Sequence, residues 1–328
     1  MDITTYISAQ TRHIEKLIRA DIDNWSKTCE PILAEICAYG LLSAGKRIRP
    51  VLAVLSARLC GGEQPWLYAM AVGFEYLHTA TLFHDDIIDG AKSRRGQIPV
   101  AGKYGVNATI LAGDYLHTVA IAHISKYCGD AGVTALSRAT RAMVSGEFTQ
   151  QRLIGDIDQS EADYFSVITA KTAVLLGASC EIGALAAGAT AKKSEALYRY
   201  GLTLGRAYQI IDDILDYIGT SGKTGKVVGN DLAEGKITLP LLRAYQRANR
   251  HDKDKLRGIV ASPDRRRRDF AEVVRILNDY DGFGAARQAA AREVDRARAA
   301  LRECEVGADS ESLAMLTELC EFILTRQK

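Results

Sequence analysis

Proline, tryptophan and unbroken apolar runs are scarce in this chain. Its 328 residues include 6 prolines and 2 tryptophans, and no stretch of 18 consecutive apolar residues occurs, so no transmembrane helix is predicted. Alternation typical of strands between turn residues is also missing. Few prolines and long stretches rich in Ala, Leu, Arg and Glu favour helix. The sequence therefore predicts an all-α fold, in which ligand sites are built between facing helices.

The cysteines follow no motif of closely spaced pairs. Seven are scattered along the chain without a CxxC pair, which argues against a zinc site and against a disulfide framework, and favours a reducing compartment. The N-terminus has no basic flank followed by an apolar stretch, so no signal peptide is predicted. We therefore expect a cytoplasmic protein.

Charge of one sign is not in excess. The formal net charge is +2, which offers no argument for binding nucleic acid. The one basic block, residues 264–269, is interpreted as a solvated loop leading into a helix rather than as a nucleic-acid patch. No linker rich in Pro, Gly or Ser interrupts the chain, so we expect a single domain over residues 1–328.

One acidic motif, DDxxD, occurs twice in the chain. Asp85-Asp86-Ile87-Ile88-Asp89 is matched by Asp212-Asp213-Ile214-Leu215-Asp216. If both segments are helical, the first and last aspartates of each lie one turn apart on one face. Carboxylate pairs of this kind suit Mg²⁺, which keeps several waters and bridges to phosphate oxygens. Two such pairs facing each other would hold a diphosphate from both sides.

The alternative is that each cluster is only a solvated helix face. The first motif, however, has Leu82, Phe83, Ile87 and Ile88 around it, and unpaired carboxylates are costly to bury in such surroundings. Cations should therefore lie nearby. Candidates fall at the ends of the same segments: Lys46, Arg47 and Arg49; Arg94 and Arg95; Lys171, Lys226 and Lys236. Arginine binds phosphate through its planar fork and lysine as a point charge.

With these motifs identified, the chain resembles the trans-type isoprenyl diphosphate synthases, the polyprenyl synthetase family. The resemblance covers roughly residues 40–245 in the family's order. It rests on Gly45-Lys46-Arg47-Ile48-Arg49-Pro50, His84 with the first acidic motif, Arg94-Arg95-Gly96, Leu111-Ala112-Gly113-Asp114-Tyr115-Leu116, Gly146-Glu147 with Gln150, Lys171-Thr172, Tyr208-Gln209 with the second acidic motif, Lys226, Asp231-Leu232-Ala233-Glu234-Gly235-Lys236 and Thr238-Leu239-Pro240.

The resemblance implies a helical bundle of the isoprenoid synthase type with a central cavity for diphosphate and Mg²⁺. An allylic diphosphate ionises there, and the double bond of isopentenyl diphosphate attacks the cation. Metal ligands are expected among Asp85, Asp86, Asp89, Asp212, Asp213 and Asp216, and the catalytic set is Asp85, Asp89, Lys171, Thr172, Gln209 and Asp212.

The same resemblance assigns the substrate contacts. Isopentenyl diphosphate is expected at Lys46, Arg49, His78 and Arg95, and the allylic diphosphate (farnesyl or geranylgeranyl) at Arg94, Lys171, Lys226 and Lys236. A homodimer is the expected assembly. A lipid product leaves peripheral contact with a membrane open. Four positions depart from the family's common residues, which puts details of the diphosphate loops in question: Ala44, Ile98, Ala101 and Asn230.

Product length is predicted from the helix before Asp85. In this family a bulky residue four or five positions before the first aspartate closes the pocket, whereas Thr81 and Ala80 here are small. Leu77 and Phe74 lie further down, with Phe74 roughly 16 Å below Asp85 at 1.5 Å per residue. We expect a long-chain product, hepta- to decaprenyl, of the kind used in quinone side chains. Small residues that serve helix packing alone are the alternative.

Three other functions stay open to different degrees. A geranylgeranyl or short-chain synthase would share every motif. A class I terpene cyclase shares the first acidic motif, but it usually carries Asn and Ser or Thr in the second and lacks the cations around Lys46. A non-catalytic partner subunit should have lost the acidic motifs, although a catalytic subunit that needs a partner is harder to separate.

Overall fold

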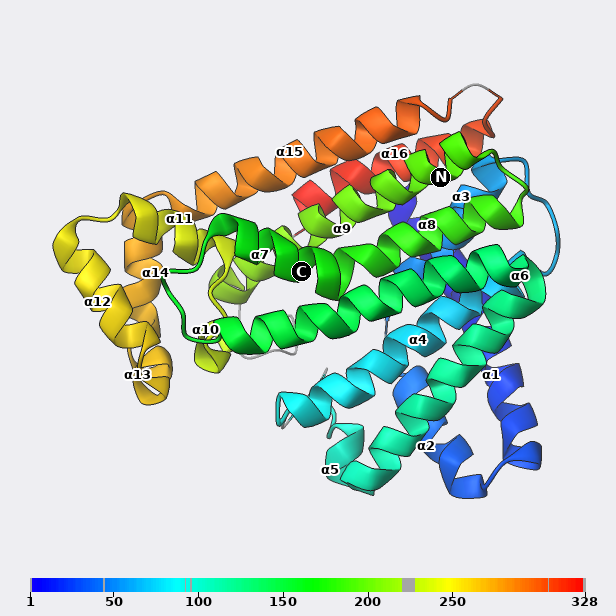
Figure 1. Ribbon diagram of the computed structural model, residues 1–328, viewed down its shortest axis with the longest axis horizontal. Coiled ribbons are helices and arrows are strands. Elements are labelled where there is room, and N and C mark those ends of the chain that lie inside the picture. Colours follow the sequence, from blue (N-terminus) through cyan, green and yellow to red (C-terminus); the bar gives the residue numbers. More distant parts are fainter. Residues whose placement is uncertain are drawn as a thin grey trace. The chain divides into compact units, whose positions relative to one another are not determined.

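The computed structural model describes residues 2–43, 45–91, 93–94, 96–219, 228–305 and 307–326. Within these ranges the chain folds into helices joined by short loops, and the only strand-like pairing is an isolated bridge between Arg94 and Gln97 (Figure 1). The predicted all-α fold is therefore confirmed.

The helices follow one another with few residues between them. Their bounds are α1 Ile3–Thr28, α2 Pro31–Leu41, α3 Ile48–Leu59, α4 Leu67–Ile88, α5 Val100–Tyr104, α6 Val106–Leu153, α7 Glu161–Ile168, η1 Thr169–Ala173, α8 Val174–Ala186, α9 Ala191–Ile218, α10 Asn230–Glu234, α11 Leu239–Arg247, α12 Arg250–Val260, α13 Pro263–Arg268, α14 Phe270–Asp279, α15 Gly282–Arg302 and α16 Ser310–Thr325.

Local sequence signals explain where several helices begin. The side chain of Asp2 accepts from the backbone of Thr4 and Thr5 at the start of α1, and Ser160 with Asp163 forms a capping box at the start of α7. Such caps satisfy amide groups that a helix leaves without partners. Three of the prolines lie in first turns, at the starts of α2, α11 and α13, where proline is tolerated.

By its internal contacts the chain divides into two units. The first comprises residues 1–138, 175–199 and 300–319, and the second comprises residues 139–174, 200–299 and 320–328. Each of the five boundaries falls inside a helix: α6, α8, α9, α15 or α16. No linker therefore separates the units along the chain, and the single domain over residues 1–328 stays a prediction.

Helix α4 is the centre of the first unit. Its side chains are buried on nearly all sides, with Phe74, Tyr76 and Leu77 at most 1% exposed. A helix that is apolar all round belongs in a core, and α4 packs against α1, α2, α3 and α5. The first acidic motif therefore comes at the end of a helix that lies in the core of this unit.

The second unit combines long helices with a group of short ones. The last part of α9 buries Ile210, Ile211 and Ile214. Helices α10 to α14 pack on one another in the pairs α10–α13, α11–α14, α12–α13 and α13–α14. Figure 1 shows these short helices in colours from yellow-green (α10) to orange (α14).

The helical run Glu161–Ala186, which comprises α7, η1 and α8, is long and apolar enough to cross a membrane by length and composition. Its most apolar window is 56% buried inside the protein, as is usual for a core helix. The run lacks 18 consecutive apolar residues, so the prediction of no transmembrane helix stays a prediction.

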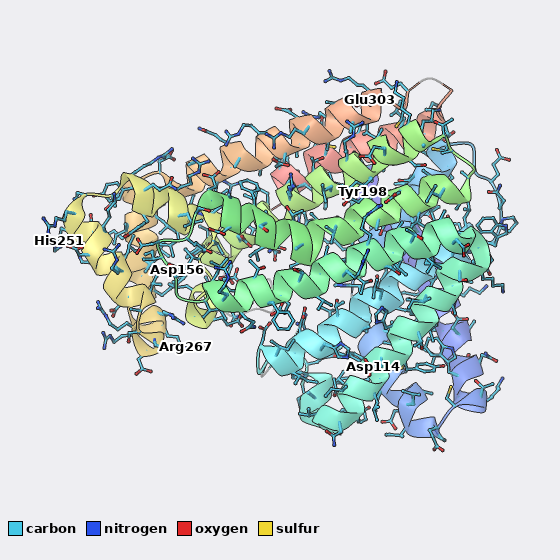
Figure 2. All side chains as sticks on the ribbon, in the orientation of Figure 1. Asp114, Asp156, Tyr198, His251, Arg267 and Glu303 are labelled. Carbon is cyan, nitrogen blue, oxygen red and sulfur yellow. The ribbon has the colours of Figure 1, made fainter. Side chains whose placement is uncertain are left out.

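The basic block at residues 264–269 is helical for most of its length and mostly engaged. Arg265 and Arg268 bind Asp269, each at 2.8 Å, while Arg266 is buried and donates to the carbonyl of Val260. Arg267 is exposed and extends outward from α13 (Figure 2). The block is therefore a helix and not the predicted loop, because Pro263 begins a helical turn, and the side chains of both Arg267 and Arg268 stay exposed.

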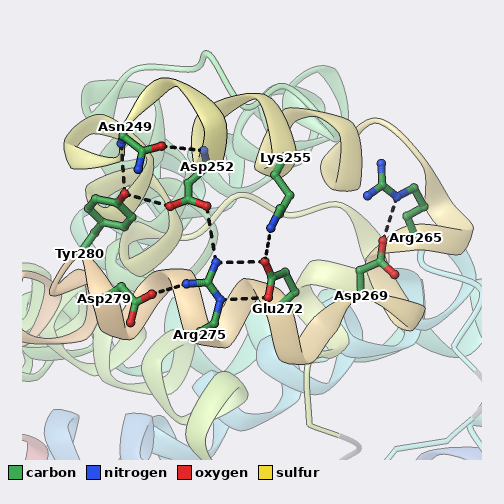
Figure 3. A network of polar contacts seen from close by, with 9 residues as sticks. All are labelled: Asn249, Asp252, Lys255, Arg265, Asp269, Glu272, Arg275, Asp279 and Tyr280. Carbon is green, nitrogen blue, oxygen red and sulfur yellow. Dashed lines mark hydrogen bonds and ion pairs between the residues drawn. The ribbon is translucent and has the colours of Figure 1, made fainter.

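A network of ion pairs joins α12 to α14 (Figure 3). Arg275 contacts Glu272 through two hydrogen bonds of 3.0 Å and also binds Asp279. Lys255 reaches Glu272 from α12 at 2.5 Å. Hydrogen bonds from Arg275 and Lys255 lower the pKa of Glu272 to about 2 from its usual 4.5.

This network should make stability depend on pH. A carboxyl whose pKa is depressed in the folded state stabilises it fully above the unfolded pKa, and this contribution is lost as pH falls toward the folded pKa. We expect the unfolding midpoint of Glu272→Gln to fall less steeply than that of the wild type between about pH 4.5 and pH 2. Thermal unfolding at stepwise pH tests this, with the exposed Glu63→Gln as control. Parallel curves for wild type and Glu272→Gln would contradict it.

Candidate active site

The first acidic motif lies at the C-terminal end of α4. The helix ends at Ile88, and Asp89 caps it by donating its backbone N–H to the carbonyl of Asp85 at 2.8 Å. Gly90 follows with φ of 59°, a conformation that glycine adopts readily and that ends helices. Asp85 and Asp89 are thus one turn apart, as the sequence predicts, and both are partly exposed. Their role as metal ligands stays a prediction.

Asp86 is placed differently from its two neighbours. It is 4% exposed, and its Oδ1 lies 2.5 Å from Nε of Arg94. Burial raises the pKa of Asp86, and the charge and hydrogen bond of Arg94 oppose that rise. The resemblance assigns Asp86 to a metal and Arg94 to the allylic diphosphate, whereas here the two side chains pair with each other.

Arg47, the middle cation of the Gly45–Pro50 segment, is buried. It is 3% exposed and has a positive φ of 48°. Its Nη1 lies 2.6 Å from Oε1 of Glu75 on α4, and its Nη2 donates to the carbonyls of Leu41 and Ser43 at 2.6 and 2.8 Å. These contacts of Arg47 fix the backbone at the start of α3. The neighbouring Lys46 and Arg49 therefore extend from a backbone whose position is fixed.

The other predicted residues of the first unit lie on α3 and α4 or just before them. Lys46 is exposed and precedes α3, Arg49 is half-buried in its first turn, and His78 is half-buried on α4. Helices α3 and α4 pack against each other. Below Asp85, Ala80, Leu77 and Phe74 are each at most 2% exposed, and Thr81 is half-buried.

The second acidic motif lies in the last turns of α9. Asp212 and Asp216 are separated by one turn and are both partly exposed. The carboxylate of Asp216 accepts the backbone N–H of Asn230 at 3.3 Å and of Asp231 at 3.1 Å, which ties α9 to the start of α10. Oδ1 of Asp212 lies 3.7 Å from Arg326, whose guanidinium lies over the ring of Tyr208 at 4.1 Å.

Asp213 points into the unit's interior and is held from two sides. It is 4% exposed, and Tyr164 donates to its Oδ2 at 2.7 Å while Gln209 donates to its Oδ1 at 2.8 Å. Burial, together with the negative charge of Asp231, raises the pKa of Asp213 well above its usual range. This carboxyl is therefore part of a buried hydrogen-bond network, unlike the partly exposed Asp212 and Asp216.

The same network orients the reacting-centre residues that the resemblance predicts. Thr172 donates to Oε1 of Gln209 at 2.9 Å, so the amide of Gln209 accepts from Thr172 and donates to Asp213. Lys171 lies 2.8 Å from Glu147 on α6. Burial alone would raise the pKa of Glu147, but hydrogen bonds from Lys171 and Gln151 outweigh it and lower the pKa.

A cavity of about 160 Å³ gathers these groups. Of the residues predicted from sequence, five line it: Lys171, Thr172, Gln209, Asp213 and Lys236. Sequence reasoning missed other polar lining residues: Gln150, Gln159, Tyr164, Asp231 and Thr238. Gln150, Asp231 and Thr238 were part of the motif match without an assigned role, but no spacing or periodicity pointed to Tyr164, because its position depends on how α7 packs beside α9.

Arg95 and Lys226 lie outside the described residues, and their predicted roles stay predictions. The two acidic motifs belong to different units, so their facing arrangement also stays a prediction. Among the residues described, no three His, Cys, Asp or Glu side chains gather closely enough to hold a metal by themselves. Partly exposed carboxylates in pairs do fit Mg²⁺, which is usually completed by water and substrate phosphates.

Comparison with known proteins decides the family. The model of the family described as polyprenyl synthetase matches residues 30–277. This chain belongs to the polyprenyl synthetase family. Two similar relatives are octaprenyl diphosphate synthase of Haemophilus influenzae, 34% identical over 90% of this chain and 89% of that protein, and a short chain isoprenyl diphosphate synthase of Methanothermobacter thermautotrophicus, 34% identical over 88% of each.

Solved structures agree with this polyprenyl synthetase assignment. The polyprenyl synthase of Caulobacter crescentus, crystallised with calcium and isoprenyl diphosphate, superposes with a TM-score of 0.90 at 32% identity and covers 99% of this chain and 97% of its own. The resemblance read from the motifs is therefore confirmed at the level of the family and of the fold.

The buried pair of Arg47 and Glu75 gives the site's first prediction. Glu75→Leu would leave the Arg47 guanidinium buried without its carboxylate, which typically costs about 3–5 kcal/mol of folding free energy. Glu15→Leu removes a more exposed partner at 3.4 Å and should cost about 1 kcal/mol or less. Urea unfolding of both variants measures the difference. Equal losses would show that Glu75 is not the anchor.

Proposed function

We propose that this enzyme elongates an allylic diphosphate with successive isopentenyl diphosphate units. The carbon–oxygen bond to the allylic diphosphate breaks, the double bond of isopentenyl diphosphate forms the new carbon–carbon bond, and loss of a proton restores an alkene. The observation that carries this proposal is the pair of acidic motifs, each presenting two partly exposed carboxylates one turn apart, in a member of the polyprenyl synthetase family.

The acidic motifs would hold Mg²⁺ through Asp85, Asp89, Asp212 and Asp216. When bound, the metal supplies positive charge to the departing diphosphate. Asp86 and Asp213 instead serve through their contacts with Arg94 and with Tyr164 and Gln209. The calcium and isoprenyl diphosphate in the Caulobacter protein support a divalent cation beside an isoprenoid diphosphate.

The cations divide between the two substrates. Lys171 and Lys236 line the cavity of the second unit and would bind the allylic diphosphate with Lys226, while Arg94 would join them once released from Asp86. Lys46, Arg49, His78 and Arg95 would bind isopentenyl diphosphate. Fixed charges placed where negative charge develops are the usual main source of catalysis, so a proton-transferring side chain is not required.

A long-chain product, for quinone side chains, is the outcome we favour. The small buried Ala80 and the deep position of Phe74 support it, as does the likeness to an octaprenyl diphosphate synthase. The short chain relative makes geranylgeranyl or a shorter diphosphate the alternative. A class I terpene cyclase is disfavoured by the second acidic motif and by the family match.

A homodimer in the cytoplasm is the assembly and location we propose. On the first part of α6, four apolar residues are 36% to 67% exposed: Val106, Ile110, Leu111 and Ile121. Apolar residues clustered on one helix suit a protein interface, and twofold pairing of identical chains is common. Release of a lipid product would also be eased by peripheral contact with a membrane.

Product analysis tests the function directly. Purified protein is incubated with Mg²⁺, labelled isopentenyl diphosphate and farnesyl diphosphate, and the dephosphorylated prenols are separated by length. Heptaprenol or longer products support the long-chain proposal, and a stop at geranylgeraniol supports the alternative. If isopentenyl units are incorporated neither with farnesyl diphosphate nor, in a parallel incubation, with geranylgeranyl diphosphate, the elongation proposal is wrong for the isolated chain.

Loss of either acidic motif should abolish elongation. Asp85→Ala and Asp212→Ala remove partly exposed carboxylates, so we expect turnover to fall by about 10²–10³-fold, the scale of a lost electrostatic contact in a transition state. The unfolding midpoint should change little, because neither residue is in the core. Asp130→Ala on the exposed side of α6 is the control. Turnover within tenfold of wild type in either variant contradicts the two-motif site.

Enlarging Ala80 should shorten the product. Ala80→Phe adds an aromatic ring one turn below Asp85, which would block the growing chain while the first condensations continue. Overpacking at this buried position should also cost about 1–3 kcal/mol of stability, so the assay is run well below the unfolding temperature. Chromatography of the prenols gives the answer: an unchanged length distribution would place the end of the pocket on another element.

A further inference from the structure

Lys171 and Thr172 lie in an unusual piece of helix. Residues Thr169–Ala173 form one turn of π-helix between α7 and α8. Such turns are rare, and they are frequently found at functional sites because the inserted residue changes the direction of the side chains. The local sequence Thr169–Ala173 gives no reason for a π turn. Its cause must therefore lie in the helices that pack against it.

Two glycines bring neighbouring backbones against this π turn. A Cβ added to Gly146 on α6 would lie 2.4 Å from the Cβ of Ala170, and one added to Gly205 on α9 would lie 2.7 Å from the Cα of Ala173. Both distances are shorter than any ordinary contact. Helices α6 and α9 therefore pack directly against the π turn at Gly146 and Gly205, where no side chain would fit.

Arg206 and Glu293, here called the brace, hold Thr169, the first residue of the π turn. Nε of Arg206, the residue after Gly205, donates to Oγ1 of Thr169 at 2.7 Å. Nη1 of Arg206 lies 3.7 Å from Oε2 of Glu293 on α15. Glu293 is 2% exposed and also binds Arg296. A buried carboxylate thus orients Arg206, and Arg206 in turn holds the π turn.

The brace residues line a different cavity from the one that Lys171 and Thr172 line. Thr169, Ala170, Arg206 and Glu293 line a second cavity, of about 650 Å³, whereas Lys171 and Thr172 line the first. None of the brace residues reaches the first cavity's lining. Because Arg206 faces open space, substitution there need not disturb a packed core.

We propose that Arg206, held by Glu293, is a positioning residue for Lys171 and Thr172. By binding Thr169 it keeps the π turn from relaxing to regular α-helix, a change that would turn Lys171 and Thr172 away from the cavity, since one residue of register corresponds to about 100° of rotation. The proposal rests on the proposed function in one respect: the ligand of Lys171 is taken to be the allylic diphosphate.

The effect of the brace can be measured as a change in affinity for each of the two substrates. Thr169→Val keeps the shape of the side chain and removes its acceptor oxygen, and Arg206→Met removes the donor. We expect each to weaken binding of farnesyl diphosphate with Mg²⁺, measured by calorimetry without isopentenyl diphosphate, by about fivefold, the equivalent of a hydrogen bond worth about 1 kcal/mol. Affinity for isopentenyl diphosphate should be unchanged. Arg296→Gln, which touches Glu293 but not Thr169, is the matched control.

A double-mutant comparison tests whether the brace acts through Lys171. In a Lys171→Ala background, Thr169→Val should have no further effect on farnesyl diphosphate binding, because contacts that act through one residue are not additive. The same fivefold loss in both backgrounds would overturn the proposal, as would equal losses for the two substrates, which indicate a merely structural role.

The failure of the brace and of the proposed function can be told apart. If the wild-type protein binds neither farnesyl nor geranylgeranyl diphosphate, the proposed function is wrong, and the brace is then judged by hydrogen exchange in peptides that cover residues 165–176. Thr169→Val should speed exchange there and not in α16. Unchanged exchange in those peptides would overturn the brace independently of any substrate.

Discussion

The cost of burying charge is the constraint on which this structure depends. Arg47 with Glu75, Asp86 with Arg94, and Glu293 with Arg206 and Arg296 are pairs or groups with at least one member nearly inaccessible to solvent. An unpaired charge in such a place would destabilise the fold by several kcal/mol. Each charge therefore dictates where its partner must lie, and through the partner it orients a loop or a turn beside the candidate site.

This constraint separates the aspartates of each motif into two kinds. Asp85, Asp89, Asp212 and Asp216 are partly exposed, as suits groups that bind a hydrated metal and a diphosphate. Asp86 and Asp213 are buried, and their pKa values are raised by burial. The middle aspartate of DDxxD thus organises neighbouring side chains in both motifs. On a helix the first and last aspartates of each motif share one face, whereas the middle aspartate projects about 100° away from the first.

Close backbone approach is the second theme of the site. Gly146 and Gly205 let α6 and α9 touch the π turn that carries Lys171 and Thr172. The family motif Gly146-Glu147 thereby combines two functions: the glycine makes room, and the glutamate binds Lys171. Buried polar networks of this kind specify one arrangement only when every member is satisfied, which is the case for Asp213, Tyr164, Gln209 and Thr172.

The sequence by itself determined the helical class, the family and the one-turn spacing within each acidic motif, because composition, motif order and the 3.6-residue period are local properties. Only the tertiary structure decided that Arg47 is an anchor, that Asp86 and Asp213 are buried, and that Tyr164, Glu293 and Arg206 belong beside the site. Those outcomes depend on which distant segments pack together, and the burial energy of a side chain is set by neighbours that no local pattern in the sequence encodes.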